Sequence, residues 1–495
     1  MFEALMNDCQ IALPLLGWAL LGLLALCVRV FFPGPSGIRP SLFVTLLGLI
    51  GLIVFSAMGL QASTTHIVFQ NTIRIDSSFY VFNLLGLMIH LAVTLMLVPG
   101  LDKKTKLFEE SYEHLPELLI CLLFSGFGFS VLTAAFDLST LFLGLETLSI
   151  AAYCLCGFYR SDIRSTESAF KYLMIGAFST VLFLYGLAFL YGATANTHYL
   201  EMQGAIAQLS ASYQPLLMLA IVFLVAAFGF KLAFVPFHLY TPDVYAGAPT
   251  PITAYLATAI KVGVIAAAAK IFWIVLQPAA IYWEPFWLGL CVLSILLGNI
   301  LALQQRSLKK LLAYSSISHS GFLGLALFTS GSGNLYPMMA YLFVYSAISL
   351  GLFAIISSLE DRASDLQVDD LRGLGQKKFW PAFFMSIFVL GLAGLPPFAG
   401  FMIKFWVLES LIQQNYILVA VAAIIGSLIG AAYYLRILML VFMSDDVGLA
   451  AQGEYFKDRF YLVRLIVFLA AVLTVLGGMR PQVYADWILS TLALK

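Results

Sequence analysis

The chain has 495 residues, of which 61% are hydrophobic and only 11% charged, and its mean hydropathy is +0.96. This composition is typical of a protein that crosses a membrane many times, and it excludes an ordinary soluble globular domain. Acidic and basic residues are equal in number, 26 each, so the net charge is zero. Bulk attraction to nucleic acid or to an anionic surface is therefore not indicated.

Hydrophobic runs of about 20 residues, the length that a membrane-spanning helix needs, predict fourteen spans. In chain order they cover approximately residues 10–31, 41–61, 78–99, 115–135, 137–157, 167–192, 214–239, 251–276, 285–304, 309–329, 335–358, 380–408, 415–442 and 460–479. The connections are short, so we expect residues 1–495 to form a single membrane domain, polytopic and all-α, without β-strands. Its expected parts are three N-terminal helices (1–110), two groups of five helices (115–276 and 285–442), and a last helix with its tail (460–495).

Basic residues in the connecting segments orient these spans. With the N-terminus outside, the inner side collects seventeen of them: Arg29, Arg39, Lys103, Lys104, Lys106, Arg160, Arg164, Arg306, Lys309, Lys310, Arg362, Arg372, Lys377, Lys378, Lys457, Arg459 and Arg464. The outer side keeps three: Arg74, Arg480 and Lys495. Because basic residues favour the cytoplasmic side, both termini are expected on the periplasmic side.

Five charged residues lie in the middle of predicted spans: Glu146, Lys171, Lys231, Lys261 and Lys404. A charge at bilayer depth costs at least about 2.5–3.5 kcal/mol on insertion scales, so such residues usually face the protein interior or a water path. Four lysines and a glutamate in one chain indicate a route for protons or cations. Lys270, near the end of its predicted span, could instead extend to the membrane interface.

The seventh and twelfth spans contain helix breakers. In the seventh, Pro236 follows Lys231 by five residues, and His238 lies just beyond it. The twelfth has two adjacent prolines, Pro396 and Pro397, between glycines and shortly before its lysine. Because proline removes a backbone donor and clashes with the preceding turn, both helices should break there. Interrupted spans in corresponding halves of a chain are typical of the ion site of a transporter.

These breaks suggest two five-helix repeats, helices 4–8 and 9–13. Glu146 and Lys231 are 85 residues apart, and so are His319 and Lys404. The match is incomplete, since Pro236 follows its lysine whereas the prolines of helix 12 precede theirs. Five is an odd number, so tandem copies would have to be inverted relative to each other in the membrane.

The buried charges suggest a relay. Burial and a nearby carboxylate act in opposite directions on a lysine, which can then exchange a proton near neutral pH. Separating Glu146 from Lys231 would favour proton release and their approach would favour uptake, while Lys261, His319 and Lys404 would pass protons on through water.

Each of these residues also has a structural interpretation. Glu146 could form a static ion pair, and hydroxyl groups in AYSSISHSG could hold His319 in place. Lys171 could pair with Glu167, four residues earlier, and His238 could be an auxiliary relay group or the partner of a carbonyl at the break. CxxC pairs, HExxH and a GxGxxG after a strand are absent from the sequence. We therefore expect no metal site, flavin, iron–sulfur cluster or nicotinamide in this chain.

The stretch GFKLAFVPFHLYTPDVYAGAPTPITAYLATAIK resembles the antiporter-like membrane subunits of respiratory NADH:quinone oxidoreductase (complex I, NDH-1). LETLSI, ESAFKYLMIGAFS, LKKLLAYSSISHSG and GLPPFAGFMIKF extend the resemblance over nearly the whole chain. Among the three paralogous families, subunit L has a long lateral helix after its spans, and subunit M typically has glutamate where Lys404 stands here. The chain is most similar to the subunit N family, and fourteen spans favour a bacterial protein.

The resemblance implies a role for each matching residue. Glu146 would modulate Lys231, Lys261 and His319 would carry the central relay, and Lys404 would govern exchange with the far side. Lys171 would be auxiliary. The chain would translocate protons in the cell inner membrane beside other complex I subunits, which would hold NADH, FMN, iron–sulfur clusters and quinone.

Three other interpretations remain open at this point. One is a subunit of a multi-subunit cation/proton antiporter, which shares this fold and these lysines. Another is a close relative, either subunit M or a membrane-bound hydrogenase subunit. The third is a structural spacer whose charges only hold helices together.

Overall fold

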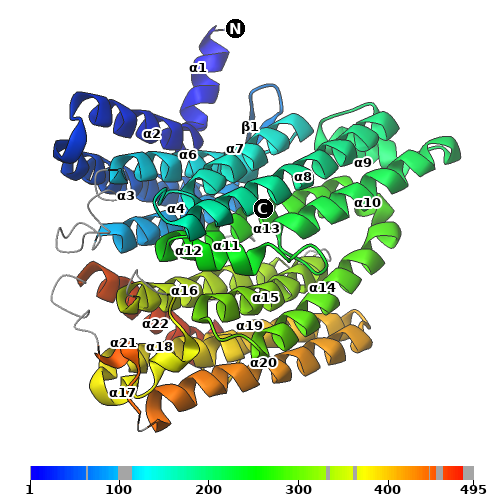
Figure 1. Cartoon of the computed structure of the whole chain (residues 1–495). Coiled ribbons are helices and arrows are strands. Elements are labelled where there is room, and N and C mark those ends of the chain that lie inside the picture. Colours follow the sequence, from blue (N-terminus) through cyan, green and yellow to red (C-terminus); the bar gives the residue numbers. More distant parts are fainter. Residues whose placement is uncertain are drawn as a thin grey trace.

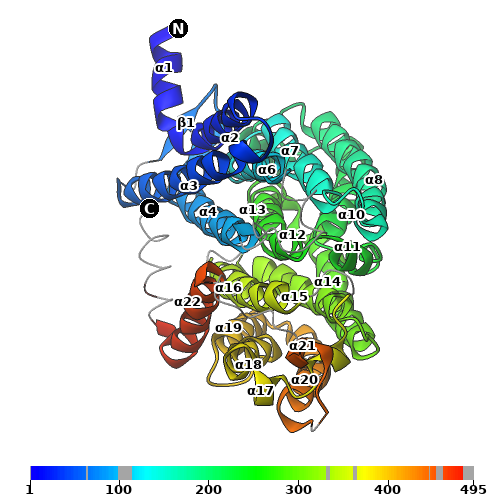
Figure 2. The same cartoon turned by 60° about the vertical axis from the view of Figure 1, so that its left-hand side comes forward.

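The computed structural model describes residues 2–62, 65–98, 114–330, 335–360, 365–444, 446–452, 461–482 and 486. Six of the basic residues used above to orient the inner side, Lys103, Lys104, Lys106, Arg362, Lys457 and Arg459, lie outside the described residues, as does Lys495 on the outer side. The chain forms a bundle of long helices that run in roughly the same direction, seen from the side in Figure 1 and more nearly end-on in Figure 2.

Within the described residues, thirteen helices are long and apolar enough to cross a membrane, so the chain is a multi-pass membrane protein. The N-terminal part contains α1 (Phe2–Ile11), α2 (Leu13–Phe31), a 3-10 turn (Gly34–Gly37), α3 (Ile38–Ala62) and α4 (Ser77–Leu97). The middle part contains α6 (Leu115–Ala134), α7 (Leu138–Cys156), α8 (Ile163–Thr194), α9 (Tyr199–Ala207), α10 (Gln214–Lys231), α11 (Thr241–Gly247), α12 (Thr250–Tyr255) and α13 (Lys261–Lys270). The last part contains α14 (Ala280–Leu303), α15 (Leu308–Ser330), α16 (Tyr336–Leu359), α17 (Leu374–Lys377), α18 (Phe379–Ala393), α19 (Ala399–Gln413), α20 (Ile417–Met443), α21 (Leu449–Gln452) and α22 (Tyr461–Met479).

Both predicted helix breaks are confirmed. α10 ends at Lys231, and regular helix resumes in α11 at Thr241, so the span predicted over 214–239 stops eight residues early. The segment predicted over 380–408 is two helices of 15 residues each, α18 and α19, with the prolines between them. Neither half is long enough to count as a span by itself, which accounts for thirteen rather than fourteen.

The eighth span contains an irregularity that the sequence analysis did not predict. It runs over Thr250–Val275, but two of its turns are π-helical, Leu256–Ile260 and Ile271–Val275. Each π turn carries an extra residue, which rotates the side chains that follow it, and such turns occur often at functional sites. The first π turn lies directly before Lys261, so it sets the direction in which that lysine points.

A short hairpin corrects the expectation of no strands. Strand β1 (His66–Val68) pairs antiparallel with β2 (Ile73–Ile75), and His66 lies opposite Ile75. Val68 and Ile75 pack in a cluster with Leu15 of α2. Strands of three residues are too short to show the alternating pattern that identifies a strand in a sequence.

The most buried spans lie at the centre of the bundle. These are α15, α16 and the span over Thr250–Val275. Figure 2 shows them where the blue-to-green half of the chain meets the green-to-red half. A helix that is apolar and buried all round belongs in the core of the protein rather than against lipid. Polar side chains on these three helices are therefore shielded from the membrane.

Candidate functional site

Glu146 and Lys231 form the predicted ion pair. The Lys231 ammonium lies 3.7 Å from a Glu146 carboxylate oxygen, and both side chains are largely buried, 8% and 17% exposed. The lysine also donates hydrogen bonds to the Ser149 hydroxyl at 2.9 Å and the Tyr153 hydroxyl at 3.4 Å. Thr180 of α8 donates to the glutamate at 2.7 Å. Because α10 ends at Lys231, the charge lies where helical hydrogen bonding is interrupted.

A small cavity separates Lys231 from Lys261. Its volume is about 20 Å³, and a cavity of roughly 10–15 Å³ on this measure already holds one water. Both lysines line it, together with Tyr172 of α8, Tyr245 of α11 and Tyr240 of the break between α10 and α11. Polar groups on its walls make the cavity suitable for water, so the first two lysines share a hydratable space.

Lys261 reaches across to α15. Its ammonium donates to the backbone carbonyl of Ser316 at 2.6 Å and also to the Ser316 hydroxyl. That hydroxyl bonds to the Tyr345 hydroxyl at 2.9 Å and the Tyr245 hydroxyl at 3.1 Å. The Lys261 ammonium also faces the Tyr345 ring, 5.4 Å from its centroid. A continuous set of hydroxyl groups therefore begins at this lysine.

His319 lies one helical turn after Ser316 and is 4% exposed. One ring nitrogen is 2.7 Å from the Tyr341 hydroxyl, and the other is 3.3 Å from the Tyr434 hydroxyl. Its ring centroid is 5.1 Å from that of Tyr345, which also contacts Ser316. Tyr345 therefore connects the surroundings of Lys261 with those of His319.

Lys404 is hydrogen-bonded to backbone carbonyls at the second helix break, between α18 and α19. Its ammonium donates to the carbonyls of Leu392 at 3.0 Å and Ala393 at 3.2 Å, which are left without helical partners where α18 ends. It also faces the Phe322 ring, 5.4 Å from the centroid. That ring stacks on Tyr341, with centroids 6.2 Å apart. Between described residues, no hydrogen bond is seen that joins Lys404 to His319, and Phe322 lies on this path.

Gly394 ends α18 with a positive φ of +80°. A β-carbon there would lie 2.9 Å from Cδ of Lys404 and 3.2 Å from its ammonium nitrogen. Gly394→Ala is therefore expected to displace the lysine as well as to cost about 1 kcal/mol or more for the left-handed conformation. The melting temperature should therefore fall. Gly289→Ala on α14, where a β-carbon meets open space, is the matched control and should not lower it.

Lys171 and His238 lie apart from these contacts. Lys171 makes the predicted pair with Glu167 at 2.8 Å and a second pair with Asp243 of α11 at 2.7 Å, and its side chain is 39% exposed. Asp243 also pairs with Lys310 at 3.2 Å. His238 lies in the break, 6% exposed, and neither ring nitrogen has a hydrogen-bond partner among the described residues.

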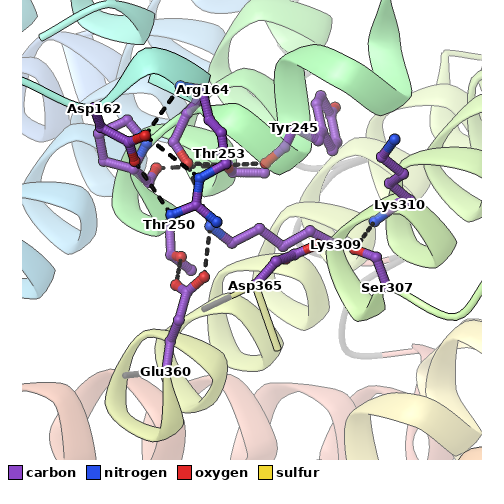
Figure 3. A network of polar contacts seen from close by, with 12 residues as sticks. Asp162, Arg164, Tyr245, Thr250, Thr253, Ser307, Lys309, Lys310, Glu360 and Asp365 are labelled. Carbon is purple, nitrogen blue, oxygen red and sulfur yellow. Dashed lines mark hydrogen bonds and ion pairs between the residues drawn. The ribbon is translucent and has the colours of Figure 1, made fainter. Parts of the chain in front are cut away.

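A second buried ion pair, between Lys309 and Glu360, lies beside Thr250 at the start of α12 (Figure 3). The ammonium of Lys309 is 2.8 Å from a Glu360 carboxylate oxygen, and the side chains are only 5% and 15% exposed. Thr250, at the start of α12, donates to the same carboxylate. Lys309 also donates to the carbonyl of Ala248, directly after α11, at 3.3 Å. The adjacent lysines 309 and 310 thus bind both ends of α11.

The hydroxyl groups were not among the predicted site residues, and the hydroxyl-rich run 314–320 was noted only as a possible support for His319. Ser316 and Tyr345 connect Lys261 with the surroundings of His319. The sequence contained a signal for Ser316 and another for Tyr345. The run contains four serines and a tyrosine, and Tyr341 and Tyr345 are four residues apart on the next helix. Neither signal shows which helices face each other, so only the structure relates them to the lysines.

In the described part of the chain, no group of three or more histidine, cysteine, aspartate or glutamate side chains is arranged to hold a metal ion. What the fold and site define is a polytopic membrane protein with buried, hydrogen-bonded ionisable groups across its centre.

Residues 135–430 match the family model described as NADH:quinone oxidoreductase/Mrp antiporter, transmembrane. The chain is 34% identical to NADH-quinone oxidoreductase subunit N of Methylobacterium nodulans, over 96% of this chain and 97% of that one.

Two solved structures are also similar. A chain of respiratory complex I from Thermus thermophilus has a TM-score of 0.78 and 29% identity, covering 95% of this chain and 97% of that one. A chain of the Mrp complex from Dietzia sp. has a TM-score of 0.80 over 98% and 97% of the two chains, but at 19% identity it shows the fold alone. The chain belongs to the NADH:quinone oxidoreductase/Mrp antiporter family and, within it, to the subunit N proteins.

Proposed function

We propose that this chain is the proton-translocating subunit N of a bacterial NADH:quinone oxidoreductase. Support comes from the relatives named subunit N, which match over nearly the full length, and from the structural similarity to complex I. The chain would lie in the cell inner membrane against other membrane subunits. NADH, FMN, iron–sulfur clusters and quinone would belong to partner subunits, where quinone is reduced, and this chain would couple that reaction to proton movement.

One observation carries the proposal: Lys231 and Lys261 line the same cavity, which is large enough for water. On one side of it stands Glu146, and on the other the Ser316 hydroxyl. A buried charge is costly and is usually kept for function in a membrane protein. Two lysines that line one hydratable space can exchange a proton through water, which a static scaffold does not require.

The geometry suggests an order of transfer. Approach of Glu146 stabilises the Lys231 ammonium, and its withdrawal favours release of the proton into the cavity. Lys261 receives the proton there, and the hydroxyl groups of Ser316 and Tyr345 connect it with the surroundings of His319. Passage onward to Lys404 requires water or side-chain movement past Phe322.

The same proposal includes fourteen spans in two inverted repeats. Taken together, α18 and α19 make one broken span, the counterpart of α10 and α11. The packing is consistent with two copies. In the first group, the first helix (α6) packs on the second (α7) and on the fifth (α13); in the second group, α14 packs on α15 and α20 in the same manner. Under this proposal the chain is divided into residues 1–110, 115–276, 285–442 and 460–495, and both termini are periplasmic.

The rival function is a cation/proton antiporter subunit. Its support is the Mrp-like fold, which the low identity limits to the fold. The nearly full-length match to subunit N favours the quinone reductase. The scaffold interpretation accounts for Lys171, whose pairs are half-exposed, but gives no reason for the shared cavity.

The deciding experiment is NADH-driven proton pumping in membrane vesicles that carry Lys231→Ala. Assembly and NADH:quinone activity are measured on the same preparation. We expect a fully assembled complex that has lost both pumping and coupled quinone reduction, because the lysine that pairs with Glu146 and opens onto the cavity is missing. Normal pumping and turnover in the assembled variant would reject the relay and favour a scaffold or an unrelated antiporter.

A further inference from the structure

One short helix projects from the bundle. α1 (Phe2–Ile11) is separated by Ala12 alone from α2, whose apolar span begins at Leu13. Figures 1 and 2 show that α1 stands away from the other helices, and that its axis crosses the direction in which they run. Because α2 crosses the membrane, α1 leaves the bundle at the membrane boundary and extends along the plane of the membrane.

One side of α1 is fixed to the β-hairpin. The Asp8 carboxylate accepts a hydrogen bond at 3.0 Å from the backbone N–H of Phe69, which lies between β1 and β2. Ile11 packs against the hydrophobic cluster that contains Val68 and Ile75. Asp8 and Ile11 are three residues apart, so they share one side of the helix. The hairpin occupies that side, and the rest of the helix surface faces away from it.

The remaining surface of α1 divides into a polar side and an apolar side. The polar side is exposed and consists of Glu3, Asn7 and Gln10. On the apolar side, Leu5 is 51% exposed and Met6 49%, with the half-buried Cys9 between them. At about 100° per residue, these three side chains fall within an arc of about 100°, and Met6 lies nearly opposite Asp8. α1 therefore presents apolar side chains away from the hairpin.

This apolar surface continues onto the first span. Leu13, Leu20 and Leu24 of α2 are 42%, 54% and 56% exposed. The two charged residues of α1, Glu3 and Asp8, are both acidic, so acidic head groups do not attract the helix and apolar contact is the attraction that remains. A helix that lies along the membrane plane with one apolar and one polar side is typical of an interfacial helix.

We propose that α1 is an interfacial helix that binds the lipid surface. Leu5 and Met6 would insert at the boundary between head groups and acyl chains, and Asn7 would face water. The proposal commits to lipid rather than a neighbouring subunit because the apolar side of α1 adjoins the exposed leucines of a membrane-crossing helix. The hairpin, bound to Asp8, would thereby be held at the membrane surface. None of this depends on the proton relay, so either proposal can fail without the other.

The test uses the whole complex in phosphatidylcholine vesicles. A photoreactive benzoylphenylalanine replaces either Leu5 or Asn7, which are about 200° apart around the helix. After irradiation, phospholipid attached to peptides of α1 is quantified by mass spectrometry. We expect position 5 to capture at least about tenfold more phospholipid than position 7, which corresponds to about 1.4 kcal/mol. Equal capture at the two positions would overturn the proposal, and so would capture of a neighbouring subunit at position 5.

A pair of double variants tests the same proposal without a cross-linker. Leu5→Gln with Met6→Gln removes the apolar side, and a helix of ten residues is marginal in water by itself. In lipid nanodiscs, a protease of broad specificity should therefore cut within α1 of this variant at least about tenfold faster than in the unaltered chain. Glu3→Gln with Asn7→Gln changes only the polar side and should stay as resistant as the unaltered chain. Equal cleavage of the two double variants would contradict lipid binding by the apolar side.

Discussion

Lys261→Met is expected to abolish NADH-driven proton pumping in an assembled complex and to reduce coupled quinone reduction to background. Lys261 lies in the middle of the proposed path, with the water-sized cavity on one side and the Ser316 hydroxyl on the other. Methionine has a similar length and suits a buried site, so the packing should survive. What is lost is the only charged group between Lys231 and His319 among the residues that line this path.

Lys270→Met is the matched control, because Lys270 ends the helix that Lys261 begins. Its ammonium donates to the carbonyls of Thr133 and Ala135 and does not line the cavity. This variant can reduce assembly, but the complex that does assemble should pump normally. Pumping and turnover should be measured in the same vesicles as assembly. If both variants lose pumping equally, the loss reflects burial of lysine in general and not a path through Lys261.

The sequence predicted most of the fold because hydropathy is a local property. Twenty apolar residues define a span without knowledge of its neighbours, and the structure has helix in every predicted segment. The breaks were also predictable, since proline acts on its own helix. The pairing of Glu146 with Lys231 followed from a scarcity of candidates, because Glu146 is the only carboxylate among the five charged residues in the middle of the predicted spans.

The contacts of Lys261 with other helices were beyond prediction. The partners of Lys261 come from α15 and α16, and nothing in the spacing along the chain relates these helices to α13. The π turn before Lys261 alters the direction of the side chain, and no proline or glycine within Leu256–Ile260 announces it. Polar residues that join helices therefore have to be located in three dimensions.

Lys309 shows how an inference from charge distribution can hide a structural feature. Its position near the start of a span identified it as one of many inner-side basic residues, which are usually solvated. The structure instead places it in a buried pair with Glu360, next to Thr250 and the carbonyl of Ala248. The neighbouring Lys310 has the expected half-exposed position. Two adjacent lysines thus have different environments, and this difference can be measured.

Lys309→Met is expected to lower the stability of the subunit by about 3–5 kcal/mol, because it leaves the Glu360 carboxylate buried without its cation. Lys310→Met removes only a half-exposed pair with Asp243, which keeps its bond to Lys171. Exposed pairs contribute about 0–1 kcal/mol, so this control should melt close to the unaltered protein. The measurement is the thermal melting of the purified complex in detergent, followed through this subunit.

A double-mutant cycle completes this prediction. Glu360→Met alone should also destabilise, since the Lys309 ammonium then retains only the Ala248 carbonyl as an acceptor among its described partners. Lys309→Met combined with Glu360→Met removes both charges together, and replacing a buried pair by apolar residues is often nearly neutral. The double variant should therefore melt well above either single variant. Additive losses would mean that the two residues act separately, and that the C-terminal end of α11 is held by packing rather than by this pair.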